Sequence, residues 1–322
     1  MNTYPIKFEP ILQEKIWGGS KLNTVLHKNC ANDLVGESWE ISGVQENISQ
    51  VNNGEYKGLS IVDLLETHKE DFLGNKNYAR FGNEFPLLIK FLDAKTNLSV
   101  QVHPDDTLAK EAHNSFGKTE MWYIMDHDED AEIILGFKDE TTESSVLENV
   151  NSSNVYDIFN TEKVTKGDAY YIPAGQIHAI GAGVLAAEIQ QTSDITYRVY
   201  DWDRTDDAGN KRDLHIEESI SASKKTLSDC KKSINPSFNT SSEIVQSDYF
   251  TTNIIDVKHQ YIKNYSNLDS FVIFMCVEGT AVVGVDGNIE NISTGETILI
   301  PANAELVTFN TESAKILEVY ID

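Results

Sequence analysis

A strand followed by a sharp turn, at residues 167–178, constrains the fold of this chain most. The segment reads Gly, five residues, Pro, one residue, Gly, two residues and His. Gly167 permits a tight turn into a strand, and Pro173 and Gly175 turn the chain again directly after it. His178 then starts the next strand pointing inward. The pattern therefore predicts two short β-strands with an imidazole at the turn between them.

The same spacing returns 128 residues later, at residues 295–306, with Asn303 in place of the second Gly and Leu306 in place of the His. Strand-like runs with hairpin signals, such as Asp286-Gly287, precede it. The spacing resembles the second motif of the cupin superfamily. This resemblance implies a mainly β fold of two cupin-type (jelly-roll) β-barrels with a small helical segment. Because the second copy lacks the His, we expect its barrel to be structural.

The segment 98–105, Leu-Ser-Val-Gln-Val-His-Pro-Asp, places three polar side chains on one face of a strand. Side chains alternate along a strand, so Ser99, Gln101 and His103 face one way and the two valines between them face the other. Histidine is the commonest metal ligand among side chains. The segment therefore supplies half of a candidate metal site, although an edge strand showing these groups to solvent would have the same pattern.

Two charged residues interrupt otherwise apolar strands. Glu120 lies in the strand 117–124 on the same face as Lys118. A buried carboxylate costs several kcal/mol without a partner, which a metal or Lys118 could supply. Lys90 interrupts the apolar run 86–92, where its ammonium either reaches water or faces a cavity.

Gln101, His103, Glu120 and His178 together form a candidate ligand set. Two imidazoles with oxygen ligands suit zinc, and iron(II), manganese and cobalt also accept this set. No cysteine takes part, which leaves positions open for water or substrate and favours a catalytic over a structural site.

The segment 188–204 is dense in polar groups and is interpreted as an irregular loop of the active site. Asp194 could position a proton, and Arg198 could hold an anion with two parallel hydrogen bonds. A salt-bridged surface loop is the alternative interpretation.

The length of 322 residues favours one large domain or two ordinary ones. We expect a catalytic domain over residues 1–227, with a short helical insertion at about 60–80 that begins at the capping residue Ser60. Residues 228–248 are rich in Ser, Asn and Lys, which predicts a linker or a long surface connection. Residues 249–322 would form the second barrel, without a metal.

Charge and cysteine content restrict the partners and the compartment. The formal net charge of -25 would repel nucleic acid and anionic membranes, so neither is an expected partner. An anionic substrate would require a local cluster of Lys and Arg. The three cysteines show no metal or disulfide spacing, and the N-terminus shows no targeting pattern. These features predict a cytoplasmic protein.

Taken together, the segments resemble type I mannose-6-phosphate isomerases in their shorter bacterial form. The resemblance extends over nearly the whole chain. It is carried by Pro86-Leu87-Leu88-Ile89-Lys90, Ser99-Val100-Gln101-Val102-His103-Pro104, Lys118-Thr119-Glu120-Met121-Trp122-Tyr123, Pro173-Ala174-Gly175-Gln176-Ile177-His178 and the loop from Ser193-Asp194 to Arg198.

The resemblance implies one Zn²⁺ ion held by Gln101, His103, Glu120 and His178. It also implies that Arg198 is catalytic, that Asp194, Lys118 and Lys90 line the pocket, and that Ser99 lies near the phosphate of the substrate. Longer family members carry a larger helical insertion and a basic, Gly-rich start after the arginine. Here Val199-Tyr200-Asp201 follows, so the groups that hold the phosphate are not assigned.

The implied reaction interconverts D-mannose 6-phosphate and D-fructose 6-phosphate. The expected partner is therefore a small-molecule sugar phosphate. A proton leaves C2 and returns at C1 through an enediol, a step that requires a base within hydrogen-bond reach. Asp194 and Lys118 are both candidates. An iron(II)-dependent cupin dioxygenase and a non-catalytic sugar-phosphate-binding cupin are the alternatives, and a monomer and a homodimer are equally compatible with the sequence.

Overall fold

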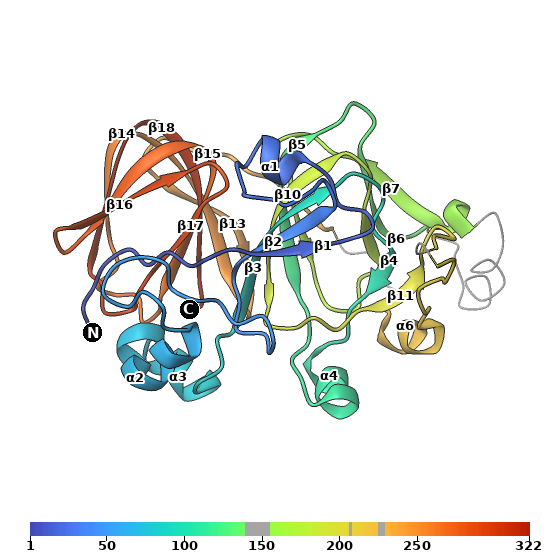
Figure 1. Cartoon of the computed structure of the whole chain (residues 1–322), viewed down its shortest axis with the longest axis horizontal. Coiled ribbons are helices and arrows are strands. Elements are labelled where there is room, and N and C mark those ends of the chain that lie inside the picture. The colour runs from blue at the N-terminus through green and yellow to red at the C-terminus, as the bar shows by residue number, and fades with distance from the viewer. Residues whose placement is uncertain (139–154, 206–207, 225–228) are drawn as a thin grey trace.

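The computed structural model describes residues 1–138, 155–205, 208–224 and 229–322, and strands dominate these parts of the chain (Figure 1). The helices are α1 (Lys21–Thr24), α2 (Ile61–Leu73), α3 (Asn75–Phe81), α4 (Asp106–His113) and α6 (Ile216–Ala222), with a short 3₁₀ helix at Val155–Ile158. The mainly β cupin-type fold predicted from the sequence is confirmed. Strand pairing between the described residues leaves the sheets open, so neither half is a closed barrel.

Two sheets build the first half of the chain. The seven-stranded sheet has the order β1 (Ile11–Glu14), β2 (Val35–Ile41), β3 (Leu87–Ala94), β10 (Val184–Gln191), β5 (Glu120–His127), β8 (Ala169–Ile172) and β12 (Lys231–Lys232). The five-stranded sheet has the order β11 (Tyr197–Tyr200), β4 (Val100–Val102), β9 (His178–Ile180), β6 (Glu132–Phe137) and β7 (Phe159–Lys163). Apolar side chains of both sheets, among them Trp122 and Ile133, pack into one core.

The central strands β3, β5 and β10 are buried on both faces, which explains their nearly continuous apolar sequence. One set of alternating side chains, such as Ile89 and Ile189, joins a core shared with the C-terminal half. The opposite set includes Lys90, Glu120 and Glu188 and faces the five-stranded sheet. This alternation positions the candidate site between the two sheets of the first half.

The second half is a six-stranded sheet folded around its own apolar core. Its strands are β13 (Ser241–Gln246), β14 (Thr251–Asn264), β18 (Leu306–Tyr320), β15 (Val272–Val285) and β16 (Asn288–Ser293), with β17 (Thr297–Ile300) paired to β15. Leu306, the counterpart of His178, is 49% exposed and does not enter that core. Ile6 pairs with Leu299, so the N-terminal segment crosses to this half.

The helices α2 and α3 occupy residues 61–81, the stretch where the sequence analysis expects a helical insertion. Ser60 accepts a hydrogen bond from the backbone N–H of Asp63, whose side chain accepts from the N–H of Ser60, a complete capping box. Gly74, at a positive φ of 94°, ends α2, and α3 follows directly. A Cβ at Gly74 would lie 2.2 Å from the carbonyl oxygen of Asp269, so this turn also requires a glycine for its close contact with the C-terminal half.

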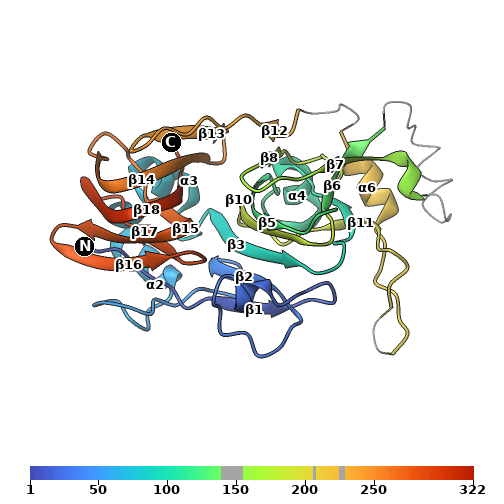
Figure 2. The same ribbon diagram turned by 90° about the horizontal axis from the view of Figure 1, so that it is seen from above.

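Residues 229–248 connect the two halves and contain two short strands, β12 in the first half and β13 in the second. Lys231 pairs with Tyr170 in the first half, and Ser241 pairs with Ile255 in the second. This stretch passes along one side of the two halves, which lie next to each other in Figure 2. The predicted boundary at residue 227 lies outside the described residues and stays a prediction. No helix in the described parts of the chain is long and apolar enough to cross a membrane.

Candidate active site

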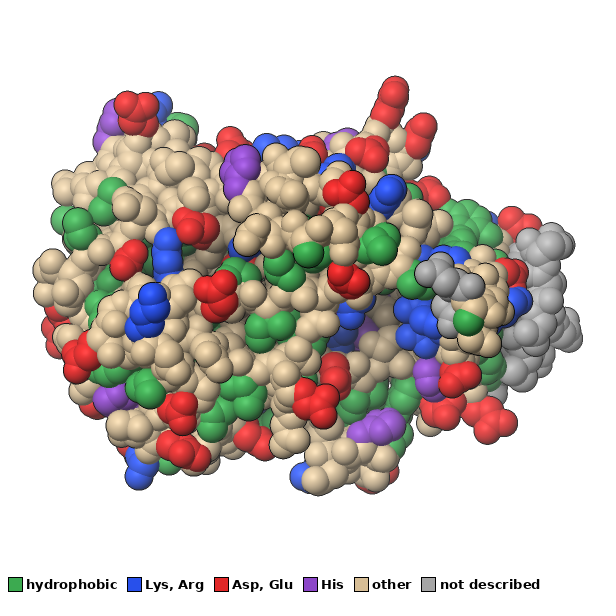
Figure 3. Space-filling view, in the orientation of Figure 1, with side chains coloured by type: hydrophobic (Ala, Val, Ile, Leu, Met, Phe, Trp, Pro, Cys, Tyr) green, Lys and Arg blue, Asp and Glu red, His purple; other side chains and the backbone are tan. Residues whose placement is uncertain are grey.

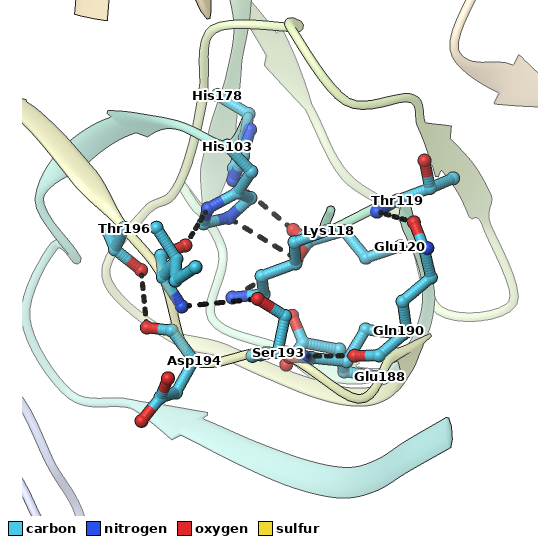
Figure 4. A network of polar contacts seen from close by, with 12 residues as sticks. His103, Lys118, Thr119, Glu120, His178, Glu188, Gln190, Ser193, Asp194 and Thr196 are labelled. Atoms are coloured by element: carbon cyan, nitrogen blue, oxygen red, sulfur yellow. Dashed lines mark hydrogen bonds and ion pairs between the residues drawn. The ribbon is translucent and has the colours of Figure 1, made fainter. Parts of the chain in front are cut away.

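Three side chains from different strands converge between the two sheets of the first half (Figure 4). Glu120 opens β5 of one sheet, His178 opens β9 of the other, and His103 directly follows β4. The Nε2 atom of His178 lies 3.2 Å from Oε1 of Glu120, and Nε2 of His103 lies 3.5 Å from Oε2. All three are at most 1% exposed.

The hydrogen bonds of the two imidazoles fix their tautomers. Nδ1 of His103 lies 2.8 Å from the carbonyl oxygen of Ile195, and Nδ1 of His178 lies 2.8 Å from that of Gln176. A carbonyl can only accept, so each Nδ1 carries the hydrogen and each Nε2 presents a lone pair to Glu120. Both Nε2 atoms and both carboxylate oxygens are buried without a hydrogen-bond partner among the described residues. Buried acceptors that face one another are unfavourable unless a proton or a metal cation lies between them.

Burial also shifts the pKa values of the three residues in this cluster. Burial lowers the pKa of His178 to about 4 and that of His103 well below its usual value, which keeps both rings neutral, the form that binds metal. Burial, and then the nearby Glu188, raise the pKa of Glu120 to about 8. The cluster of His103, Glu120 and His178 thus favours positive charge, which the other side chains of the protein supply only in part.

The spacing of these atoms fits a metal ion. Two ligands of a tetrahedral zinc with bonds of about 2.0–2.1 Å stand roughly 3.3 Å apart, close to the two separations measured from Glu120. Gln101 pairs directly with His178 across β4 and β9, and residues directly opposite one another point to the same face of a sheet. The amide of Gln101 therefore points toward the same space. The structure brings His103, Glu120 and His178 together, while the participation of Gln101 and the role of the set as a metal site stay predictions.

A second buried cluster lies beside the first and includes residues that the sequence analysis missed. Lys90 is 5% exposed and does not reach water; its Nζ lies 3.1 Å from Oε2 of Glu188 and 2.8 Å from Oε1 of Gln190. The indole N–H of Trp122 donates to Oε1 of Glu188 at 3.0 Å. Nζ of Lys118 lies 3.5 Å from Oε2 of Glu120. Glu188 belongs to β10, which continues to residue 191, and not to the irregular loop expected at 188–204. An acidic residue within an apolar strand, the signal used for Glu120, could have identified it.

Arg198 continues the line of paired residues Gln101 and His178 across the five-stranded sheet. It pairs with Gln101, which pairs with His178, so these three side chains share the face that contains the site. Burial, and then the charges of Arg212 and Arg204, lower the pKa of Arg198. Its Nε is buried without a hydrogen-bond partner among the described residues.

Three of the four arginines of the chain gather near this end of β11. Arg204 and Arg212 both donate to the buried carboxylate of Asp201. Burial opposes ionisation of Asp201, but these hydrogen bonds outweigh it and lower its pKa. One carboxylate thus orders two guanidinium groups next to a third, in a chain with a net charge of -25. The sequence analysis predicted a local basic cluster without identifying its members.

Two other predicted residues, Asp194 and Ser99, lie in different positions relative to the cluster of His103, Glu120 and His178. Asp194 is exposed, and its carboxylate points away from Glu120 and the imidazoles in Figure 4. Ser99 is 5% exposed and directly precedes β4, on the face of Gln101 by alternation. The molecular surface of the first half is hollowed (Figure 3). Lys or Arg side chains and His side chains are visible within this recess. A small polar molecule could therefore approach the cluster from solvent.

Comparisons with known proteins agree with this geometry. Residues 6–145 match the profile of the phosphomannose isomerase type I catalytic domain, and residues 240–321 match that of the mannose-6-phosphate isomerase cupin domain. The Bacillus subtilis protein named "Putative mannose-6-phosphate isomerase YvyI" is 35% identical over 308 residues, which is 94% of each chain. Mannose-6-phosphate isomerase ManA of the same organism is 43% identical over 68% of each chain.

A crystal structure of a mannose 6-phosphate isomerase from Bacillus subtilis superimposes with a TM-score of 0.89 at 33% identity. The match covers 98% of this chain and 99% of that structure. Sequence similarity and fold therefore agree over almost the entire length. The chain belongs to the type I phosphomannose isomerase family.

Proposed function

We propose that this chain is a zinc-dependent aldose-ketose isomerase that interconverts D-mannose 6-phosphate and D-fructose 6-phosphate. One observation carries the proposal: two neutral imidazoles and the carboxyl group of Glu120, all buried, face one another, and their four facing atoms have no hydrogen-bond partner among the described residues. His103, His178, Glu120 and Gln101 would hold the metal. Bound there, the ion supplies Lewis-acid and template chemistry without a change of redox state.

The surrounding residues supply what the proton transfer requires. A base must approach the proton on C2, and geometry decides first among candidates. Lys118 is buried beside Glu120, whereas Asp194 is exposed and turned away, so we propose Lys118 as the group that moves the proton. Arg198 would stabilise the negative charge that develops on the enediol oxygens through its unpartnered Nε.

The second buried cluster, with Lys90, Glu188 and Gln190, would orient the hydroxyl groups of the sugar. Lys90 and Glu188 form a buried ion pair between the metal cluster and the core, and Gln190 extends it. A site built on paired, immobilised groups loses little freedom when the substrate binds. Arg204 and Arg212 add positive charge near Arg198, and with Ser99 they are the proposed attraction for the phosphate.

We also propose a cytoplasmic location, as the sequence analysis predicted. No disulfide joins Cys30, Cys230 and Cys276 in the structure, which fits a reducing compartment.

A coupled assay tests the function directly. Purified protein is given mannose 6-phosphate, and fructose 6-phosphate formation is followed before chelation, after chelation, and after zinc is restored. We expect turnover that chelation abolishes and zinc restores. Turnover that survives complete metal removal would refute the metal-dependent mechanism, and no turnover in the metal-loaded protein would refute the isomerase.

An anaerobic repeat of the assay distinguishes the dioxygenase. Isomerisation consumes no oxygen, so the rate is expected to be the same without air. Oxygen consumption with an iron-loaded sample, together with absent isomerisation, would favour the alternative. Binding of the sugar phosphate without either reaction would favour a non-catalytic cupin.

A further inference from the structure

The strand that carries Arg198 lies at the edge of the five-stranded sheet. β11 pairs with β4 on one side only. On its other side, the backbone N–H of Arg198 donates to Nδ1 of His215 at 3.2 Å, and the backbone N–H of His215 donates to the carbonyl oxygen of Arg198 at 2.8 Å. A single residue thus satisfies both main-chain groups of Arg198 at the edge of the sheet. Such groups otherwise bond to solvent or to another strand.

The same segment also holds the side chain of Arg198. Its Nη1 donates to the carbonyl oxygen of Asp213 at 2.8 Å. Three hydrogen bonds from a three-residue stretch therefore fix the backbone and one end of the guanidinium group. The remaining buried donor, Nε, has no partner among the described residues.

The ring of His215 is committed to this contact. His215 stands at the N-cap position of α6, yet its side chain makes no capping hydrogen bond. The ring instead lies beside Tyr197, with centroids 6.3 Å apart. Because a backbone N–H can only donate, Nδ1 of His215 must be the acceptor, and the neutral ring carries its hydrogen on Nε2.

This edge contact determines where the side chain of Arg198 points. With both of its main-chain groups directed to His215, Arg198 forms a non-hydrogen-bonded pair with Gln101, the type of antiparallel pair whose side chains lie closer together. This pairing directs the guanidinium group of Arg198 toward the side chains of Gln101 and His178. A peptide rotation at Arg198 would break this arrangement.

We propose that His215 is a positioning residue for Arg198: its Nδ1 and backbone N–H lock the edge of β11 so that the free Nε faces the reacting oxygens. This role rests on the proposed isomerase function. His215 does not touch the substrate and acts only through Arg198. A displacement of about 1 Å at a catalytic group can cost about 100-fold in rate, so the contact matters although it is remote from the metal.

Two substitutions separate positioning from packing. His215→Phe keeps the ring contact with Tyr197 and the backbone N–H but removes the acceptor, so we expect kcat to fall at least about tenfold, with KM and bound metal unchanged. His215→Asn loses the ring but places an amide oxygen near the Nδ1 position, and it should recover most of the rate. His113→Phe is the matched control: His113, the last residue of α4, lies 2.7 Å from the hydroxyl of Tyr197 on β11, and no hydrogen bond joins it to Arg198 in the described parts of the chain. Its kcat should stay within about twofold of wild type.

A second measurement does not depend on activity. Labelling with ¹⁵N-arginine gives four backbone amides, one of them that of Arg198. We expect this amide to exchange slowly with solvent in the wild type and in His215→Asn, and at least about tenfold faster in His215→Phe, because a weakened hydrogen bond opens more often.

The outcomes distinguish this proposal from the function it rests on. An inactive, metal-loaded wild type refutes the isomerase, while the exchange data still decide whether His215 holds Arg198. An active His215→Phe with wild-type kcat refutes the positioning role alone. Equal losses in both His215 variants, with a matching loss of thermal stability, would also overturn it in favour of simple packing.

Discussion

The buried pair between Lys90 and Glu188 allows a quantitative prediction of stability. Both side chains are 6% exposed, and Glu188 also accepts the indole hydrogen of Trp122. Glu188→Gln keeps the shape of the side chain and an oxygen for Trp122, but removes the charge that balances Lys90. The ammonium group then remains buried without its closest counterion.

The expected cost follows from the contacts that remain. Removing one partner of a buried ion pair typically costs about 3–5 kcal/mol. Lys90 keeps Oε1 of Gln190 at 2.8 Å and the ring of Trp39 at 5.1 Å, so we expect the lower end, about 3 kcal/mol. At about 2 °C for each kcal/mol in a chain of this size, the melting temperature should fall by about 6 °C.

Urea unfolding at saturating zinc measures this cost, because bound metal would otherwise change stability by mass action. Glu243→Gln, at an exposed position, is the matched control and should stay within about 0.5 kcal/mol of wild type. The double variant with Lys90→Met removes both charges and should be more stable than the sum of the single losses implies. A Glu188→Gln protein as stable as the control would refute the argument that this pair is charged and balanced in the folded state.

Three further predictions concern the site and its counterpart. His178→Ala or His103→Ala should lose bound metal and turnover together, measured by elemental analysis and the coupled assay; full activity in either would contradict the ligand set. Arg198→Ala should keep the metal and lose about 100-fold or more in kcat, as removal of a donor to developing charge does, so wild-type kcat/KM would exclude its role. Leu306→Ala should change neither metal content nor, because the side chain is half exposed, the melting temperature by more than about 1–2 °C; lost metal would mean that the site was assigned to the wrong half.

The local pattern was sufficient for much of the fold. Alternation along the strands predicted which side chains of β4 and β5 share a face, and the capping residue Ser60 predicted where α2 begins. These features depend on neighbours within a few residues, so the sequence contains them directly. The strands β12 and β13 are not contained in the local pattern, because their pairing partners, such as Tyr170 and Ile255, lie far away along the chain.

The sequence by itself determined that His103, Glu120 and His178 are candidates for one site, since the strand or turn pattern sets the direction of each side chain. Only the tertiary structure decided which other residues join them. Glu188 meets Lys90 because β10 and β3 pair in one register, and His215 meets Arg198 because α6 closes an open sheet edge. Register and edge contacts arise from packing between distant segments, and no local pattern encodes them.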